Sequence, residues 1–88
     1  MDISDDEREF LHGMRALEIN EAGDEVYVGL SRAESVEFLG LMRQYEAGTL
    51  PPGSTERFEA LRKRHEETRR AIVAGEAPIN HSAPDGSR

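Results

Sequence analysis

The sequence predicts a small α+β protein in which a β-hairpin packs with a C-terminal helical hairpin. Three observations favour this class: an alternating apolar pattern on both sides of Gly23, two long amphipathic stretches after it, and a proline-rich turn between those stretches. The predicted order of elements is α-β-β-α-α. The elements are expected over residues 5–14, 16–20, 25–30, 32–47 and 55–74.

The first helix is predicted from its start signal. Ser4 and Glu7 have the spacing of a capping box, in which the serine accepts from the third helical N–H and the glutamate reaches back to the cap. Phe10 and Met14 then recur at helical spacing. Gly13 disfavours further helix, so the helix is expected to end at 13 or 14.

The β-hairpin is predicted from alternation and from the turn residues near Gly23. Pairing Ile19 with Val26 and Leu17 with Val28 places these four apolar side chains on one face. Because a lone two-stranded hairpin is marginal in water, it is expected to rest on a helix or beside a second hairpin.

The helical hairpin begins with a second capping box at residues 31–34, and Gly48 is expected to end its first helix. Gly40, inside that helix, costs about 1 kcal/mol relative to alanine, which predicts a neighbouring element close to its backbone. The proline pair after Gly48 prevents continuation, and Ser54 or Thr55 is expected to cap the last helix, which Gly75 ends.

The hydrophobic core is expected to draw on all five elements. Its predicted members are Phe10, Leu11, Met14, Leu17, Ile19, Val26, Val28, Leu30, Val36, Leu39, Met42, Phe58, Leu61 and Ile72.

Residues 1–75 are predicted to form one compact domain, and residues 76–88 have the composition of a disordered tail. The chain has no cysteine, which excludes disulfides, thiolate metal sites and thiol catalysis. It also lacks an apolar stretch near the ~20 residues that a membrane span needs. The acidic N-terminus does not resemble a secretory signal, so a cytoplasmic protein is expected.

No pattern in the sequence predicts a catalytic residue, a cofactor or a metal site. The three histidines lie in three different elements, and Arg69 stands where a zinc helix beginning at His65 would need its second histidine. The serines at positions 4, 31 and 54 stand at helix starts, where capping accounts for them. The sequence therefore favours a protein that is not an enzyme.

Apolar surface on the middle helix favours an interaction protein. Phe38, Leu41 and Tyr45 widen its apolar arc beyond what one partner helix covers, which indicates either a third packed element or a protein interface. The leading hypothesis is a non-enzymatic regulatory module that binds another protein, or a second copy of itself, through amphipathic helices.

The alternative hypothesis is a nucleic-acid-linked regulator, because the charge is uneven. Residues 1–25 carry nine acidic and two basic residues, whereas the last helix is mildly basic. The protein could bind DNA through this helix, or its acidic end could mimic a nucleic-acid backbone and inhibit a DNA- or RNA-binding protein. Glutamates interleaved with the arginines disfavour direct binding. The candidate electrostatic contacts are Asp5, Asp6, Glu7, Glu9, Arg62, Arg64, Arg69 and Arg70.

Overall fold

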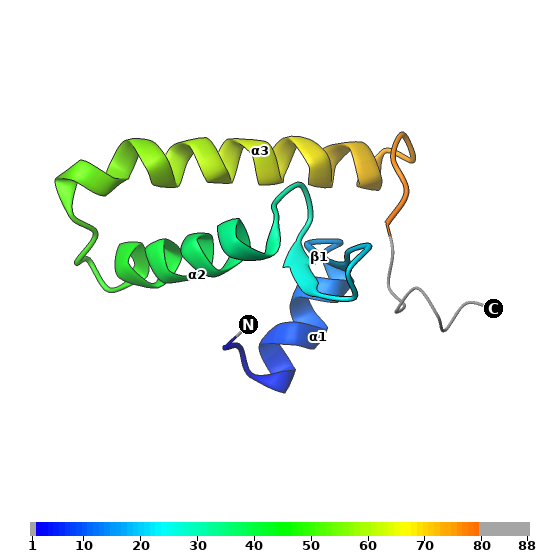
Figure 1. Ribbon diagram of the computed structural model, residues 1–88, viewed down its shortest axis with the longest axis horizontal. Coiled ribbons are helices and arrows are strands. Elements are labelled where there is room, and N and C mark those ends of the chain that lie inside the picture. Colours follow the sequence, from blue (N-terminus) through cyan, green and yellow to red (C-terminus); the bar gives the residue numbers. More distant parts are fainter. Residues whose placement is uncertain (1, 80–88) are drawn as a thin grey trace.

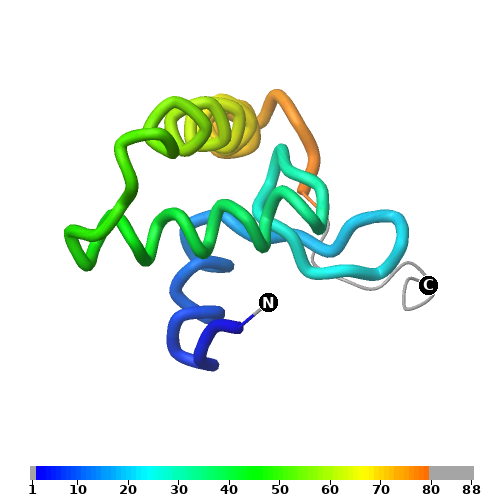
Figure 2. Tube along the Cα trace, turned by 60° about the vertical axis from the view of Figure 1, so that its left-hand side comes forward, coloured from blue at the N-terminus to red at the C-terminus, as the bar shows by residue number. Residues whose placement is uncertain are grey.

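The computed structural model describes residues 2–79 and confirms the α+β class and the α-β-β-α-α order. Three layers follow one another in Figures 1 and 2: α3 on one side, α2 with the β-hairpin in the middle, and α1 on the other side. The elements are α1 (Asp5–Gly13), β1 (Leu17–Ile19), β2 (Glu25–Tyr27), α2 (Arg32–Glu46), a 3-10 turn η1 (Pro52–Ser54) and α3 (Thr55–Val73).

Both predicted capping boxes are present. Ser4 Oγ accepts from the Glu7 N–H at 3.1 Å while Glu7 Oε1 accepts from the Ser4 N–H at 3.0 Å, and Ser31 and Glu34 repeat this pattern at the start of α2. The start of α3 differs, because Ser54 caps it without a side-chain hydrogen bond.

All three helices end with a residue in the left-handed region. Gly48 and Gly75 take this position after α2 and α3, as the sequence predicts, with φ of 74° and 79°. After α1 the position belongs to Arg15, at φ 64°, which glycine would occupy with less strain. The same pair of backbone hydrogen bonds closes each end, for example Arg15 N–H to His12 O and Ala16 N–H to Leu11 O.

The predicted register of the hairpin is wrong by one residue. Leu17 pairs with Tyr27, and Ile19 pairs with Glu25. The turn explains the slip, because Asn20 Oδ1 accepts from the Ala22 and Asp24 N–H groups while Asn20 N–H donates to Asp24 O. Asn20 thus closes the loop opposite Asp24 rather than opposite residue 25.

This slip places Tyr27 on the face of Leu17 and turns Val26 and Val28 to the opposite face. All four side chains are nevertheless buried, so both faces of the hairpin are covered. The second strand also ends at Tyr27 rather than at residue 30, and Gly29 turns the chain toward α2 at φ 84°.

An aromatic cluster forms the centre of the core. The Tyr27 and Phe38 rings meet edge to face with centroids 5.2 Å apart, and Phe38 stacks on Phe58 at 5.8 Å. Leu17 and Leu61 complete this cluster and are fully buried. Residues from β1, β2, α2 and α3 therefore share one apolar centre.

Two buried hydrogen bonds fix the β-hairpin to the helical hairpin. Ser35 Oγ, buried in α2, accepts from the Tyr27 N–H at 2.9 Å. The Nδ1 atom of buried His65 lies 2.9 Å from Val28 O, and since a carbonyl only accepts, Nδ1 carries the proton. Each contact satisfies a backbone group that burial would otherwise leave unpaired.

A separate ion pair joins α2 to α3. Arg64 donates two hydrogen bonds to the Glu34 carboxylate, at 2.7 and 2.9 Å. This guanidinium, with the Ser31 N–H, lowers the pKa of Glu34 to about 2. The stability that this pair contributes is present above pH 4.5 and is lost as the pH falls toward 2.

Several core predictions are wrong. Phe10 is 66% exposed, Met14 38% and Val36 51%, whereas Tyr27, Phe38 and His65, absent from the predicted core, are buried. Within residues 2–79, no atom of another element lies within 4 Å of a Cβ placed at Gly40, so the predicted close approach there is also wrong.

The predicted tail begins at Glu76. Residues 76–79 continue from α3 without helix or strand, and the predicted disorder of residues 80–88 lies outside the described residues.

Candidate protein-binding groove

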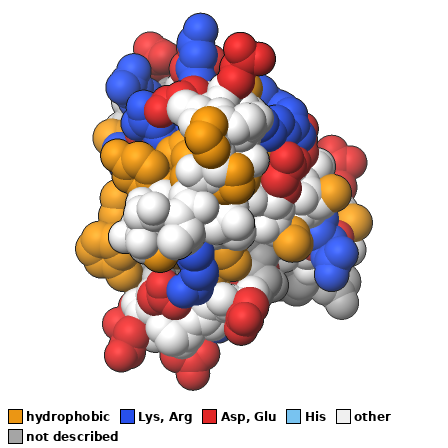
Figure 3. Space-filling model, turned by 90° about the vertical axis from the view of Figure 1, so that its left-hand side faces the viewer, with side chains coloured by type: hydrophobic (Ala, Val, Ile, Leu, Met, Phe, Trp, Pro, Cys, Tyr) orange, Lys and Arg blue, Asp and Glu red, His pale blue; other side chains and the backbone are white. Residues whose placement is uncertain are grey.

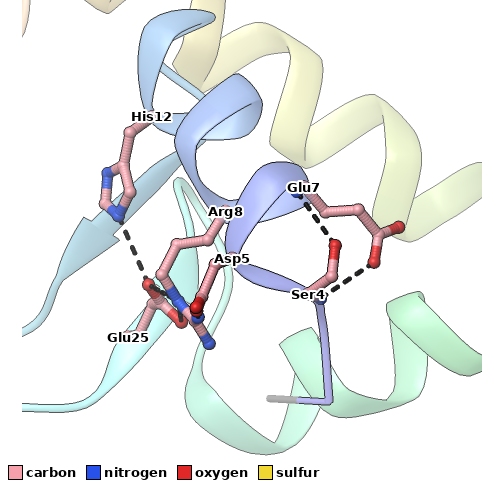
Figure 4. Close-up of polar contacts among 6 residues, drawn as sticks. All are labelled: Ser4, Asp5, Glu7, Arg8, His12 and Glu25. Carbon is pink, nitrogen blue, oxygen red and sulfur yellow. Dashed lines mark hydrogen bonds and ion pairs between the residues drawn. The ribbon is translucent and has the colours of Figure 1, made fainter.

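The α1 helix lies against the rest of the fold without burying any of its own residues. Arg8 donates through Nε to both carboxylate oxygens of Glu25 at 2.9 and 3.0 Å, and His12 Nε2 lies 3.3 Å from the same carboxylate. Figure 4 shows both side chains reaching from α1 toward this single residue of β2. Leu11 of α1 also packs, partly buried, against the core, so α1 is held on the hairpin by this part-buried ionic cluster together with one apolar side chain.

A second polar contact joins the start of α1 to α2. Arg43 donates through Nη2 to Asp2 O at 3.0 Å and to Glu7 Oε1 at 3.3 Å. Because Glu7 also caps α1 through Ser4, its pKa is lowered, with the Ser4 N–H as the largest cause. These contacts hold α1 at a distance from α2 that leaves a space between the two helices.

That space is an apolar groove of about 280 Å³, called here the α1–α2 groove. Phe10 and Met14 form its α1 wall, Met42 and Leu39 its α2 wall, and Tyr27 lines it from the hairpin. Leu11, Glu7, Arg43 and Glu46 complete the lining.

Phe10 is the largest exposed side chain of this lining, and it lies exposed beside a floor of buried residues. Hydrophobic side chains gather along the left edge of the face in Figure 3, above acidic side chains near the bottom. An exposed aromatic residue beside an apolar hollow is typical of a protein-binding surface.

A smaller cavity of about 160 Å³ lies next to the groove and shares Leu11, Met14, Tyr27 and Met42 with it. His65 of α3 also lines this cavity. Burial raises the pKa of Tyr27 to about 12, and burial lowers the pKa of His65. At neutral pH both rings are therefore uncharged, and they meet edge to face at 5.3 Å as packing partners.

The predicted interface residues have three different environments. Phe38 is 3% exposed, so its placement on an open surface is wrong: it is covered by the hairpin and by α3. Leu41 is partly buried against the core. Tyr45 is 63% exposed and stacks on Phe58, so it alone of the three remains open to a partner.

The basic residues of α3 lie among acidic ones. Arg62 binds Glu59, Arg64 binds Glu34, and Arg69 binds Glu66. Arg69 also donates to Met14 O at 3.1 Å, at the end of α1. Arg70 is exposed on a shallow surface that it shares with Glu59, Glu66 and Glu67. The four candidate arginines thus do not form a cationic face apart from carboxylates.

The acidic candidates gather on α1. Asp5 pairs with Arg8 at 3.1 Å, Glu7 pairs with Arg43, and Asp6 and Glu9 are exposed. Of these four acids, Glu7 lines the α1–α2 groove, and the basic candidates lie on α3.

Within residues 2–79, no three histidine, aspartate or glutamate side chains converge as metal ligands do. Over the same part of the chain, each helix is too short or too polar to cross a lipid bilayer.

Comparison with protein-family models, with curated proteins and with solved structures finds no match to this chain.

Sequence reasoning missed the groove because it assigned Phe10 and Met14 to the core. Two signals were available: α1 has only nine residues, and acids occupy four of its first five positions. A short helix of this composition has too narrow an apolar stripe to be buried as a core helix.

Proposed function

We propose that this protein is a small non-enzymatic interaction module that binds a protein partner through the α1–α2 groove. The observation that carries the proposal is Phe10, a two-thirds exposed aromatic side chain on the wall of an apolar hollow. Exposed aromatic residues beside fillable pockets dominate the binding energy of many interfaces. Tyr45, also exposed, extends the apolar surface along α2.

The arrangement of charges supports a protein ligand over DNA. Three arginines of α3 that could contact phosphates are bound to carboxylates of the same chain, and the groove itself is bordered by acids. Backbone mimicry by the acids of α1 is the alternative, because Asp6 and Glu9 are exposed there. The cysteine-free composition supports a cytoplasmic location for the interaction.

Site-specific photo-crosslinking in the source cell tests the proposal. A photo-reactive phenylalanine analogue at position 10 is conservative in shape and is expected to give one discrete crosslinked protein. The matched control is the same analogue at position 36, because Val36 is similarly exposed but does not line the groove.

A crosslinked species of twice the chain mass would identify the partner as a second copy. Absence of any crosslink at position 10, or equal crosslinking at both positions, would overturn the proposal. Retention of crosslinking after neutralising Asp6 and Glu9 would argue against mimicry, which depends on those charges.

A further inference from the structure

The α1–α2 groove has the chemistry to select a particular kind of partner, and this inference rests on the proposed function. We propose that its ligand is a basic amphipathic helix from another protein, which inserts apolar side chains between Phe10 and Met42 and places lysines or arginines against the acidic rim.

The shape of the groove favours a helical ligand. Its walls are two helices, and its lining is mainly the side chains of Phe10, Leu11, Met14, Leu39 and Met42. An extended peptide would bring unpaired N–H and C=O groups onto this apolar floor, where few partners exist for them. A helix satisfies its own backbone and presents apolar side chains along one stripe.

The charge of the rim favours a basic ligand. Glu7 borders the groove on α1 and Glu46 borders it on α2. Among the described residues that line the groove, Arg43 is the one cation, and it is already bound to Glu7 and to Asp2 O. The rim is therefore net negative, and complementary charges would hasten association and select the partner.

A second copy of this chain fits the groove poorly. In a two-fold dimer the same surface meets itself, so Glu7 and Glu46 would oppose Glu7 and Glu46 of the other copy. The basic helix α3 could not enter instead, because its large apolar side chains other than Val73 are buried in its own core. Those side chains are Phe58, Leu61 and Ile72.

The test uses the full chain and a pair of designed peptides about two heptads long. One carries leucine on one helical face and lysine on the other, and its counterpart has glutamate in place of every lysine. Binding is followed by titration calorimetry, and the contact surface by backbone amide shifts in NMR spectra. We expect the lysine peptide to bind and to shift amides around Phe10, Met14 and Met42, and the glutamate peptide not to bind.

Two matched variants distinguish binding in the groove from non-specific attraction between the basic peptide and the acidic protein. Glu46→Lys reverses a rim charge, whereas Glu67→Lys makes the same change on the exposed face of α3, outside the groove. We expect Glu46→Lys to lower the affinity for the lysine peptide by about tenfold at low salt. Glu67→Lys should lower this affinity much less. Phe10→Ala should also lower the affinity for the lysine peptide, and it changes no charge.

The outcomes distinguish the two proposals. Equal weakening by both lysine variants, with no effect of Phe10→Ala, would overturn the inferred groove ligand. If neither peptide binds but crosslinking at position 10 still captures a protein, the proposal of a basic helical ligand is overturned and the proposed function as an interaction module stands. Failure of the peptides together with an absent crosslink would overturn both.

Discussion

The α1 helix and the α2–α3 hairpin are attached to the same small sheet in opposite ways. The helical hairpin buries Phe38, Phe58 and Leu61 and meets the β-hairpin through a shared aromatic centre. The α1 helix fully buries no residue of its own; Leu11 packs partly buried against the core, and the other contacts are ionic, from Arg8 and His12 to Glu25 and from Arg43 to the start of α1.

The difference separates stability from recognition in this molecule. Apolar burial supplies most of the free energy of folding, so the hairpins form the part that resists unfolding. Ionic contacts that remain partly open to water add less than apolar burial, and α1, held largely by such contacts, keeps Phe10 and Met14 exposed. The α1 wall of the α1–α2 groove is therefore built from the part of the fold that contributes least to the core, whereas Leu39 and Tyr27 on its other walls belong to the core.

The largest expected effect comes from truncating one phenylalanine on each side of this comparison. Phe38→Ala should destabilise the protein by about 3–5 kcal/mol, because it leaves a cavity between Tyr27 and Phe58. Phe10→Ala should change the free energy of unfolding by less than about 0.5 kcal/mol, because the side chain is exposed. Urea unfolding followed by circular dichroism measures both. Similar losses for the two variants would show that α1 belongs to the core.

The next effect concerns the junction between the β-hairpin and α3. At Gly29, a Cβ atom would lie 2.5 Å from Thr68 Oγ1 and 3.0 Å from Arg64 O, and φ is +84°. Gly29→Ala should therefore cost roughly 2–4 kcal/mol, from backbone strain and from displacement of α3. Gly40→Ala is the matched control in open space and should be neutral or stabilising. A neutral Gly29→Ala in thermal unfolding would contradict this close approach.

Local signals in the sequence predicted much of the fold. Both serine capping boxes and the glycines after α2 and α3 act within one helical turn, so neighbouring residues suffice to identify them. The hairpin register could not be predicted the same way, because the Asn20 side chain selects it against the apolar alternation.

The candidate site was predicted less well, for a related reason. Burial depends on which elements meet, and the sequence does not reveal that the hairpin and α3 cover Phe38 while Phe10 is two-thirds exposed among residues 2–79. The pairing of the α3 arginines with carboxylates was predicted more accurately. The interleaved glutamates of α3 do bind Arg62 and Arg69, at i,i+3 spacing, and Arg64 binds Glu34 of α2.

A smaller, stabilising effect is expected on the α1 side. Arg15 holds the left-handed position that glycine holds after the other two helices, so Arg15→Gly should stabilise the protein by about 0.5–1 kcal/mol. Arg15→Ala removes the same side chain without relieving the backbone and is the matched control. The thermal midpoint measures the added stability, and slower hydrogen exchange of the α1 amides would show that the stability is gained in α1. An equal gain from Arg15→Ala would assign it to the side chain instead.

The smallest effect is a pH dependence on the hairpin side. Burial lowers the pKa of His65, so below its ordinary value of 6.5 the unfolded chain binds a proton that the folded chain does not. The free energy of unfolding should therefore decrease as the pH falls below 6.5, and Glu66 and Arg69 are the charged groups that modulate this shift. His65→Asn can keep a donor for Val28 O but cannot titrate, so it should make the free energy of unfolding depend less on pH.

Urea unfolding from pH 8 to pH 5 measures this dependence. His12→Asn is the control, because His12 contacts Glu25 outside the core. A slope that persists in His65→Asn and vanishes in His12→Asn would move the pH response from the core to the α1 contact.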